Sequence, residues 1–143
     1  MSCPDLICQP LEVMALPLVD RFYRQHGGKD RCRRHDRVWV ARRQGRMVAV
    51  ARRVPLESHW VLRGLLVDDT ERRQGVATEL LQCLLEECDE PLWCFALSHL
   101  KPLYVSLGFQ CLDTAAEPLP KAVAGALAAY RRSQPGLLGF IRS

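Results

Sequence analysis

Residues 65–81, LLVDDTERRQGVATELL, pass from an apolar run through a charged corner into a leucine-rich pattern. The apolar run at 59–67, HWVLRGLLV, is typical of a strand that ends at Val67. Beyond Gly75 the apolar residues recur at helical spacing, which predicts a helix with one buried face. The residues on that face are Ala77, Leu80, Leu81, Leu84, Leu85 and Cys88. The stretch therefore predicts a strand, a short charged loop with two arginines and an amphipathic helix.

The corner between this strand and helix has the features of an anion-binding site. A helix N-terminus presents unpaired N–H groups and about half a positive charge, so it attracts anions. Gly75 lets an anion come close to the backbone, and the small side chain of Ala77 leaves room for a second close contact. Arg72 and Arg73 add cationic donors. A diphosphate site and an ordinary strand-to-helix turn both fit these residues. The sequence contains neither a Walker loop nor a G-x-G-x-x-G motif.

The rest of the chain alternates between helical and strand patterns. Before the corner we expect a strand at 5–9, a helix within 12–28 that stops at its two glycines, and a hairpin over 37–54 that turns at Gly45. After it we expect strands at 92–97, 109–113 and 137–141, and helices at 101–107 and 119–132. The strand–helix–strand order in the middle predicts an α/β (α+β) fold with a parallel strand pair inside an otherwise antiparallel sheet.

Composition sets the class of protein. The length of 143 residues, with 48% apolar and 25% charged residues, predicts a single globular domain over 1–143. Seven cysteines lack paired C-x-x-C spacing, so we expect neither a disulfide framework nor a metal site. The absence of a leader-like or membrane-spanning apolar run favours a cytoplasmic protein with no membrane partner. The net charge is +4, carried by 17 Arg against 3 Lys, and guanidinium groups suit phosphate and carboxylate ligands.

Two motifs together resemble the GNAT superfamily of acyltransferases. The stretch 65–81 resembles its acyl-CoA binding motif, with Arg72, Gly75 and Ala77 at the R-x-x-G-x-G/A positions. The later LYVSLGF at 103–109 resembles its Y-x-x-x-G-F motif, and the order of elements is also similar. The resemblance implies a mixed, mostly antiparallel sheet with a central splayed pair of parallel strands, flanked by helices. It also implies an acetyl-CoA-dependent N-acetyltransferase.

The resemblance further implies how acetyl-CoA would be held, without a metal. The backbone of Leu65, Leu66 and Val67 would hold the pantetheine, and an N–H near Leu66 would polarise the thioester carbonyl. The diphosphate would lie against Arg72 and the backbone amides of Arg73, Gln74, Gly75, Val76, Ala77 and Thr78. Gly64 inside the strand indicates a bulge or a close backbone approach, which suits the start of the splay.

The resemblance also implies a general acid at Tyr104, whose phenol would protonate the leaving thiolate. Many relatives carry a carboxylate or His near Val61 and Arg63, but neither of these residues can act as a base. Three weak candidates for a base acting through water are Glu57, His59 and His99, and direct loss of the amine proton to bulk water is the other route.

Arg63 departs from the family pattern. Strand alternation places it on the face of His59 and Val61, which in the family looks toward the acceptor. A bidentate contact to an acceptor carboxylate or phosphate and a supporting ion pair both fit an arginine there. If Arg63 makes the bidentate contact, the acceptor is expected to be amino-acid-like.

Several alternatives stay open on sequence alone. The acceptor amine could belong to a protein or peptide rather than to a small molecule. The chain could bind CoA without catalysis, since the strand carboxylate is missing. A nucleic-acid-binding module is the less favoured alternative, supported by the cluster of Arg31, Arg33, Arg34, Arg37, Arg42 and Arg43. We expect a monomer or a homodimer.

Overall fold

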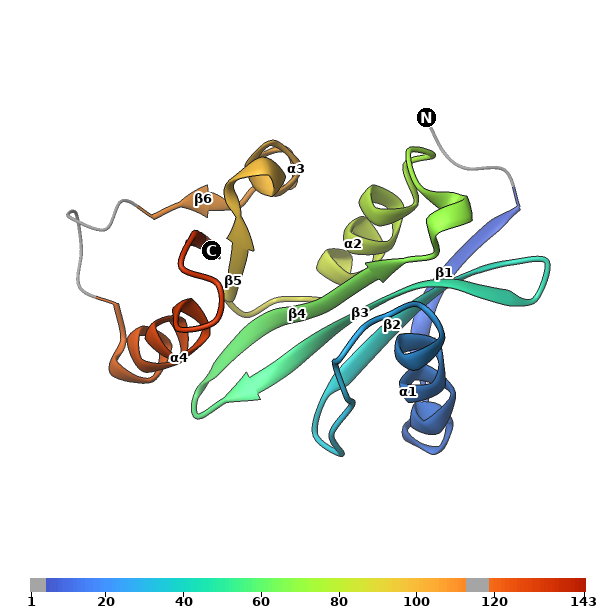
Figure 1. Cartoon of the computed structure of the whole chain (residues 1–143), viewed down its shortest axis with the longest axis horizontal. Helices are drawn as coiled ribbons and strands as arrows, with labels where there is room; N and C mark the ends of the chain where they lie inside the picture. Colours follow the sequence, from blue (N-terminus) through green and yellow to red (C-terminus); the bar gives the residue numbers. More distant parts are fainter. Residues whose placement is uncertain (1–4, 113–118) are drawn as a thin grey trace. The chain divides into compact units, whose positions relative to one another are not determined.

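The computed structural model describes residues 5–112 and 119–143, and Figure 1 shows the course of the chain. Its strands form a seven-stranded sheet in the order β1-β2-β3-β4-β5-β7-β6. The pair β4 and β5 is parallel, whereas β1 with β2, β2 with β3, β5 with β7 and β6 with β7 are antiparallel. The predicted α/β fold, with a central parallel pair in a mostly antiparallel sheet flanked by helices, is confirmed.

The chain divides into two compact units. Unit 1 comprises residues 1–54 and 63–89, and unit 2 comprises residues 55–62 and 90–143. The elements of unit 1 are β1 (Leu6–Leu11), α1 (Leu16–Gln25), β2 (Arg37–Arg43), most of β3 (Arg46–Leu56), the second half of β4 (His59–Val67) and α2 (Val76–Glu86). Those of unit 2 are the first half of β4, β5 (Leu92–Leu97), α3 (Lys101–Ser106), β6 (Gln110–Cys111), α4 (Lys121–Arg131) and β7 (Leu137–Arg142).

Helix α1 covers one face of the unit 1 strands. Its Val19, Phe22 and Tyr23 are buried against Val38, Val40 and Val50. Alternation turns the intervening strand residues to the other face, and α2 packs on β1 and β2 (Figure 1). The predicted α2 face is confirmed from Leu80 to Cys88, while Ala77 is half-buried. The predicted hairpin is also confirmed, because Gln44 and Gly45 both have positive φ, at 52° and 79°.

Helix α1 is shorter than the predicted span of 12–28. A 3₁₀ turn at Val13–Ala15 precedes it, and Pro17 lies in its first turn. Proline lacks an N–H and fixes φ, so it suits the start of a helix rather than its interior. The helix stops before Gly27, whose φ is +78°, and the Gly28 N–H closes the end by donating to the Tyr23 carbonyl.

Unit 2 packs around the parallel pair. Trp60–Leu62 of β4 pair with Leu92–Cys94 of β5, and β5 pairs along its length with β7. Val123 of α4 is buried against Val61 and Trp93. Strand β6 is shorter than the predicted 109–113, because Phe109 instead donates its N–H to the carbonyl of Tyr104, and Asp113 lies outside the described residues. The predicted strand at 137–141 is confirmed as β7 with one further residue.

Candidate functional site

Gly64 has an unusual backbone conformation inside β4. Its φ is +68°, in the left-handed region that favours glycine, and the Tyr23 hydroxyl donates a 2.6 Å hydrogen bond to its carbonyl. A Cβ at Gly64 would collide with the Tyr23 hydroxyl and would lie 2.8 Å from Arg52 Nε. The interpretation of this glycine as a close backbone approach is therefore confirmed, and α1 supplies the group that approaches.

Arg52 holds the loop after α1 against the sheet beside Gly64. Its side chain is buried, and Nη1 donates to the Arg31 carbonyl and to Asp36 Oδ2, each at 2.8 Å. Nη2 donates to Asp30 Oδ1 at 2.8 Å, and the guanidinium lies 5.5 Å from the Tyr23 ring centre. Two carboxylates thus compensate a buried cation, which is the arrangement that makes its burial tolerable. The network thus holds the loop after α1 in place beside Tyr23.

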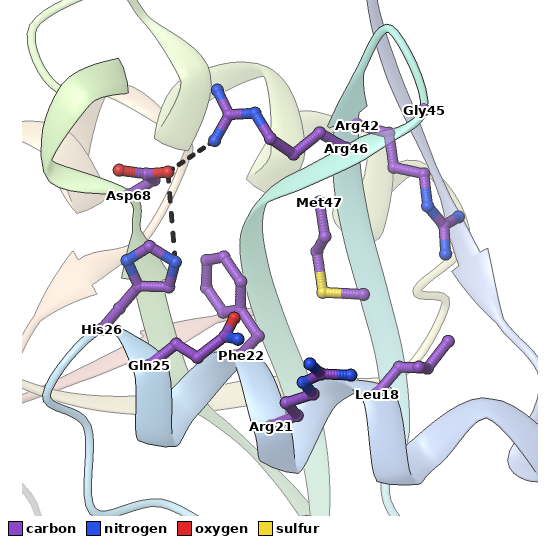
Figure 2. Close-up of a pocket in the computed structure, with 10 residues that line it drawn as sticks. All are labelled: Leu18, Arg21, Phe22, Gln25, His26, Arg42, Gly45, Arg46, Met47 and Asp68. Atoms are coloured by element: carbon purple, nitrogen blue, oxygen red, sulfur yellow. Dashed lines mark hydrogen bonds and ion pairs between the residues drawn. The ribbon is translucent and has the colours of Figure 1, made fainter.

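Asp68 begins the loop that follows β4. Its N–H donates to the Val48 carbonyl at 2.8 Å, which continues the sheet, and its Oδ1 accepts from the N–H and the hydroxyl of Thr70 at 3.0 Å each. Arg46 donates to Oδ2 at 2.7 Å, and His26 Nε2 lies 4.0 Å from the same oxygen (Figure 2). Asp68 therefore caps the short 3₁₀ turn at Asp69–Glu71 and ties it to the β2–β3 hairpin.

Glu71 is the second anchor of this loop. Its carboxylate is buried, and it accepts from Arg43 Nε at 2.8 Å and from Arg46 Nη2 at 3.4 Å. Charge-assisted bonds to a buried carboxylate are stronger than bonds between neutral groups. Two arginines of the β2–β3 hairpin thus hold the loop in place through Glu71. Arg43, which the nucleic-acid alternative needed as a surface cation, is engaged inside the protein.

The loop delivers the chain to the N-terminus of α2. Gly75 is the N-cap residue with φ +78°, no side chain caps the helix there, and Arg73 is also left-handed with φ +64°. Arg72, Arg73 and Gln74 are exposed, whereas Ala77 and Thr78 are half-buried. Successive amides in such a turn, at the positive end of a helix dipole, form a concave anion site. The geometry suits a phosphate group held by backbone N–H groups.

Asp68 gives this loop a pH-dependent contribution to stability. The hydrogen bond from the Thr70 N–H, followed by the bonds from Arg46 and the Thr70 hydroxyl, lowers the pKa of its carboxyl. A carboxyl whose pKa is lower in the folded state stabilises the fold above its unfolded pKa of about 3.9, and this contribution is lost as the pH falls through its folded value.

Asp68→Asn should therefore lower the free energy of unfolding at pH 7 by about 1 kcal/mol, because the amide can still cap the turn but loses the charge. Urea unfolding from pH 7 down to the lowest pH at which both proteins fold measures the difference, which should shrink below about pH 4. Asp69→Asn is the control, since that side chain is 82% exposed and forms a surface pair with Arg72. A difference that does not depend on pH would contradict the role of the charge.

Tyr104 belongs to unit 2 and is 4% exposed on α3. Its ring contacts Phe109 and Phe140 at centroid distances of 5.5 and 5.6 Å. Burial raises the pKa of the phenol, and the hydrogen-bonded neighbour Cys94 raises it further. The phenol therefore stays protonated at neutral pH, which a general acid requires before it donates its proton.

The three candidate bases also belong to unit 2, in different settings. Glu57 is exposed in the turn between β3 and β4, with φ +53°. His59 is half-buried, with its ring 6.3 Å from that of Trp93 in an edge-on contact. His99 is exposed in the 3₁₀ turn before α3. Nothing in these contacts singles out one of them.

Sequence patterns did not predict the residues that support the site from neighbouring elements. Arg52 lies in the apolar run of β3 on the face of Val50, and an arginine on the core face of a strand is the signal that could have found it. The anchoring role of Asp68 and Glu71 left no such signal, because acidic residues at a strand end are common on surfaces.

Arg63 is half-buried, directly before Gly64. Among the described residues, no group of acidic, His and Cys side chains could hold a metal ion.

A family model described as an acetyltransferase (GNAT) domain matches residues 34–111, which is more than half of the chain. The chain belongs to the GNAT acetyltransferase family and is an acyl-CoA-dependent acyltransferase. The resemblance predicted from the two motifs is confirmed. No curated protein sequence matches the chain significantly.

Solved structures that share this fold include the following three. Rv2747 from Mycobacterium tuberculosis, solved in complex with CoA, has a TM-score of 0.70 at 14% identity, covering 95% of this chain and 98% of that chain. ElaA from Escherichia coli has a TM-score of 0.67 at 19% identity, covering 96% and 99%. N-acetylglutamate synthase from Neisseria gonorrhoeae, complexed with coenzyme A and N-acetyl-glutamate, has a TM-score of 0.67 at 14% identity, covering 96% and 34%.

Across residues 5–112 and 119–143, no helix has the length and apolar character needed to cross a bilayer.

Proposed function

We propose that the chain transfers the acetyl group of acetyl-CoA to the amine of a small, acid-bearing molecule. The observation that carries the donor assignment is the N-terminus of α2, where Gly75 is left-handed and leaves the first amides without a side-chain cap. A diphosphate is the part of CoA that such a site would hold, with Arg72 and Arg73 as outer cations. CoA in the Rv2747 and N-acetylglutamate synthase complexes supports the same donor class.

The pantetheine is proposed to follow the backbone of Leu65, Leu66 and Val67. The side chain of Leu66 packs against the apolar cluster under α1. The β4–β5 pairing covers Trp60–Leu62 and does not reach these three residues, so this edge of their backbone is proposed to pair with the ligand. Just before them, Tyr23 donates a hydrogen bond to the carbonyl of the left-handed Gly64. An N–H near Leu66 is proposed to polarise the thioester carbonyl.

The proposed reaction is a direct transfer. The neutral amine attacks the thioester carbonyl carbon, the C–N bond forms, and the C–S bond breaks as the thiolate leaves. Tyr104 donates its phenolic proton to that thiolate, and the proton lost by the amine passes through water to Glu57, His59 or His99, or directly to bulk solvent. Tyr104 thus gives up one proton, and the base or the solvent accepts another. The enzyme regains its starting protonation state once the tyrosine is reprotonated.

Arg63 is proposed to select the acceptor. Its guanidinium can form two parallel hydrogen bonds with a carboxylate or phosphate of the acceptor. N-acetyl-glutamate, present in the Neisseria complex, is an acidic acetylated product and supports this acceptor class.

A screen of acceptors tests the proposed function. Amino acids, dipeptides, an N-terminal peptide and polyamines would each be incubated with acetyl-CoA, and the acetylated product measured by mass spectrometry. Product detection is preferred because the seven cysteines of the chain react with thiol reporters. We expect acetylation of an amine that has an acidic group nearby. Turnover of polyamines alone would contradict the acceptor assignment, and turnover of the peptide alone would make the chain a protein acetyltransferase.

Arg63→Gln should raise the KM for the acidic acceptor by about tenfold or more, because a charge-assisted bond contributes about 1.5–3 kcal/mol. The KM for acetyl-CoA should not change. The matched acceptor with its carboxylate converted to an amide is the control, and it should react equally with both proteins. An equal loss with both acceptors would show that Arg63 supports the fold and does not contact the acid.

A further inference from the structure

Unit 1 contains a pocket that the proposed acetyl transfer does not use. It lies between α1 and the β2–β3 hairpin (Figure 2). Its volume is about 380 Å³. That volume is within the range of small-molecule sites, roughly 300–1,000 Å³. The wall nearest the diphosphate loop is formed by His26, Arg46 and Asp68, and Asp68 contacts the other two.

The opposite part of the pocket has an apolar surface. Phe22 is buried at its base and Met47 is half-buried beside it. Leu18 of α1 is 51% exposed at the same place, which is unusual for a leucine that lines a pocket. A ligand with an apolar body would remove this surface from water, at about 25 cal/mol per Å².

The rim of the pocket is cationic. Arg21, Arg42 and Arg46 carry three positive charges, against the one negative charge of Asp68 among the residues that line the pocket. Arg46 is engaged by Asp68 and Glu71, whereas Arg21 and Arg42 form no ion pair with any residue that the structure describes. Figure 2 shows both of these side chains at the end of the pocket that holds Leu18 and Met47.

We propose that this pocket binds a small amphipathic organic anion. Its carboxylate would lie between the guanidinium groups of Arg21 and Arg42, and its apolar body would cover Phe22, Met47 and Leu18. A purely ionic ligand would leave the apolar surface wet, and a cation would face the excess positive charge, so neither fits as well. The proposal does not depend on the acetyl-transfer chemistry.

The test uses 4-phenylbutyrate as the probe, with the full chain and no acyl-CoA. Isotope-labelled protein is titrated, and amide chemical shifts are followed at Gln25, His26 and Gly45, which border the pocket. Acetate and 4-phenylbutylamine are the matched probes, since the first lacks the apolar body and the second reverses the charge. We expect saturable shifts with 4-phenylbutyrate and binding at least about tenfold weaker for the other two.

The variants complete the test. The double variant Arg21→Gln, Arg42→Gln should weaken 4-phenylbutyrate binding by about tenfold or more. Neither side chain is buried or in an ion pair, so the variant should fold, which its amide spectrum also checks. Arg24→Gln, an exposed arginine of α1 outside the pocket, is the control and should bind as the parent does. No saturable shift, equal binding of the amine, or equal loss in the control would overturn the proposal.

Discussion

Tyr104→Phe is expected to lower kcat by about a hundredfold while leaving the KM for acetyl-CoA unchanged. Positioned general acids contribute about 10²–10⁴-fold, and the substitution removes only the proposed proton donor. The ring contacts with Phe109 and Phe140 do not involve the hydroxyl, so the fold should lose no more than the hydrogen bond to Cys94, about 1 kcal/mol. Steady-state kinetics at saturating acceptor measure the effect.

The thermal midpoint and the affinity for CoA are the controls for this variant. Full kcat with a lowered midpoint would make Tyr104 a packing residue of unit 2. A rise in the KM for acetyl-CoA at constant kcat would assign it to binding rather than to proton transfer. Only a loss in kcat with normal CoA affinity agrees with the general acid.

Gly64→Ala is expected to destabilise the fold by about 3 kcal/mol. A side chain in the left-handed region costs about 1–2 kcal/mol, and forcing it against the Tyr23 hydroxyl and Arg52 adds an overpacking cost of about 1–3 kcal/mol. Gly45→Ala is the matched control, because Gly45 has φ +79° but a Cβ there would meet no atom within 4 Å. That variant should lose only about 1 kcal/mol in urea unfolding.

A double-mutant cycle with Tyr23→Phe separates the collision from the backbone strain. Tyr23→Phe alone removes the hydrogen bond to the Gly64 carbonyl and should cost about 1 kcal/mol. In the Gly64→Ala background the same change also removes the colliding hydroxyl, so its cost should fall or change sign. Additive losses, or equal losses at Gly45 and Gly64, would show that Tyr23 does not set the β4 turn.

The elements of this fold follow from short-range patterns. The leucine spacing after Gly75 predicts α2, the β-branched runs around Gly45 predict β2 and β3, and both are confirmed. The boundary of α1 is less accessible, because the pattern at 12–16 fits a helix until Pro17 is weighed as a starting residue. Local sequence therefore defines which elements form better than where they begin.

The supports of the site depend on contacts between distant residues, which patterns do not encode. Tyr23 and Gly64 are 41 positions apart, and Arg43 and Glu71 are 28 apart. The sequence could mark Gly64 as unusual and the corner at 72–78 as a candidate anion site, since both rest on local backbone chemistry. It could not say that α1 and the β2–β3 hairpin hold these segments in place, because each contact requires the sheet to be assembled first.

The backbone at the start of α2 is proposed to hold the diphosphate of the acyl donor. Titration of isotope-labelled protein with CoA tests it most directly, by following the amide resonances of Val76, Ala77 and Thr78. Pantetheine, which lacks the diphosphate and the adenosine, is the matched ligand. We predict large, saturable shifts of these amides with CoA and little change with pantetheine. CoA binding that leaves these three amides unmoved would contradict the account.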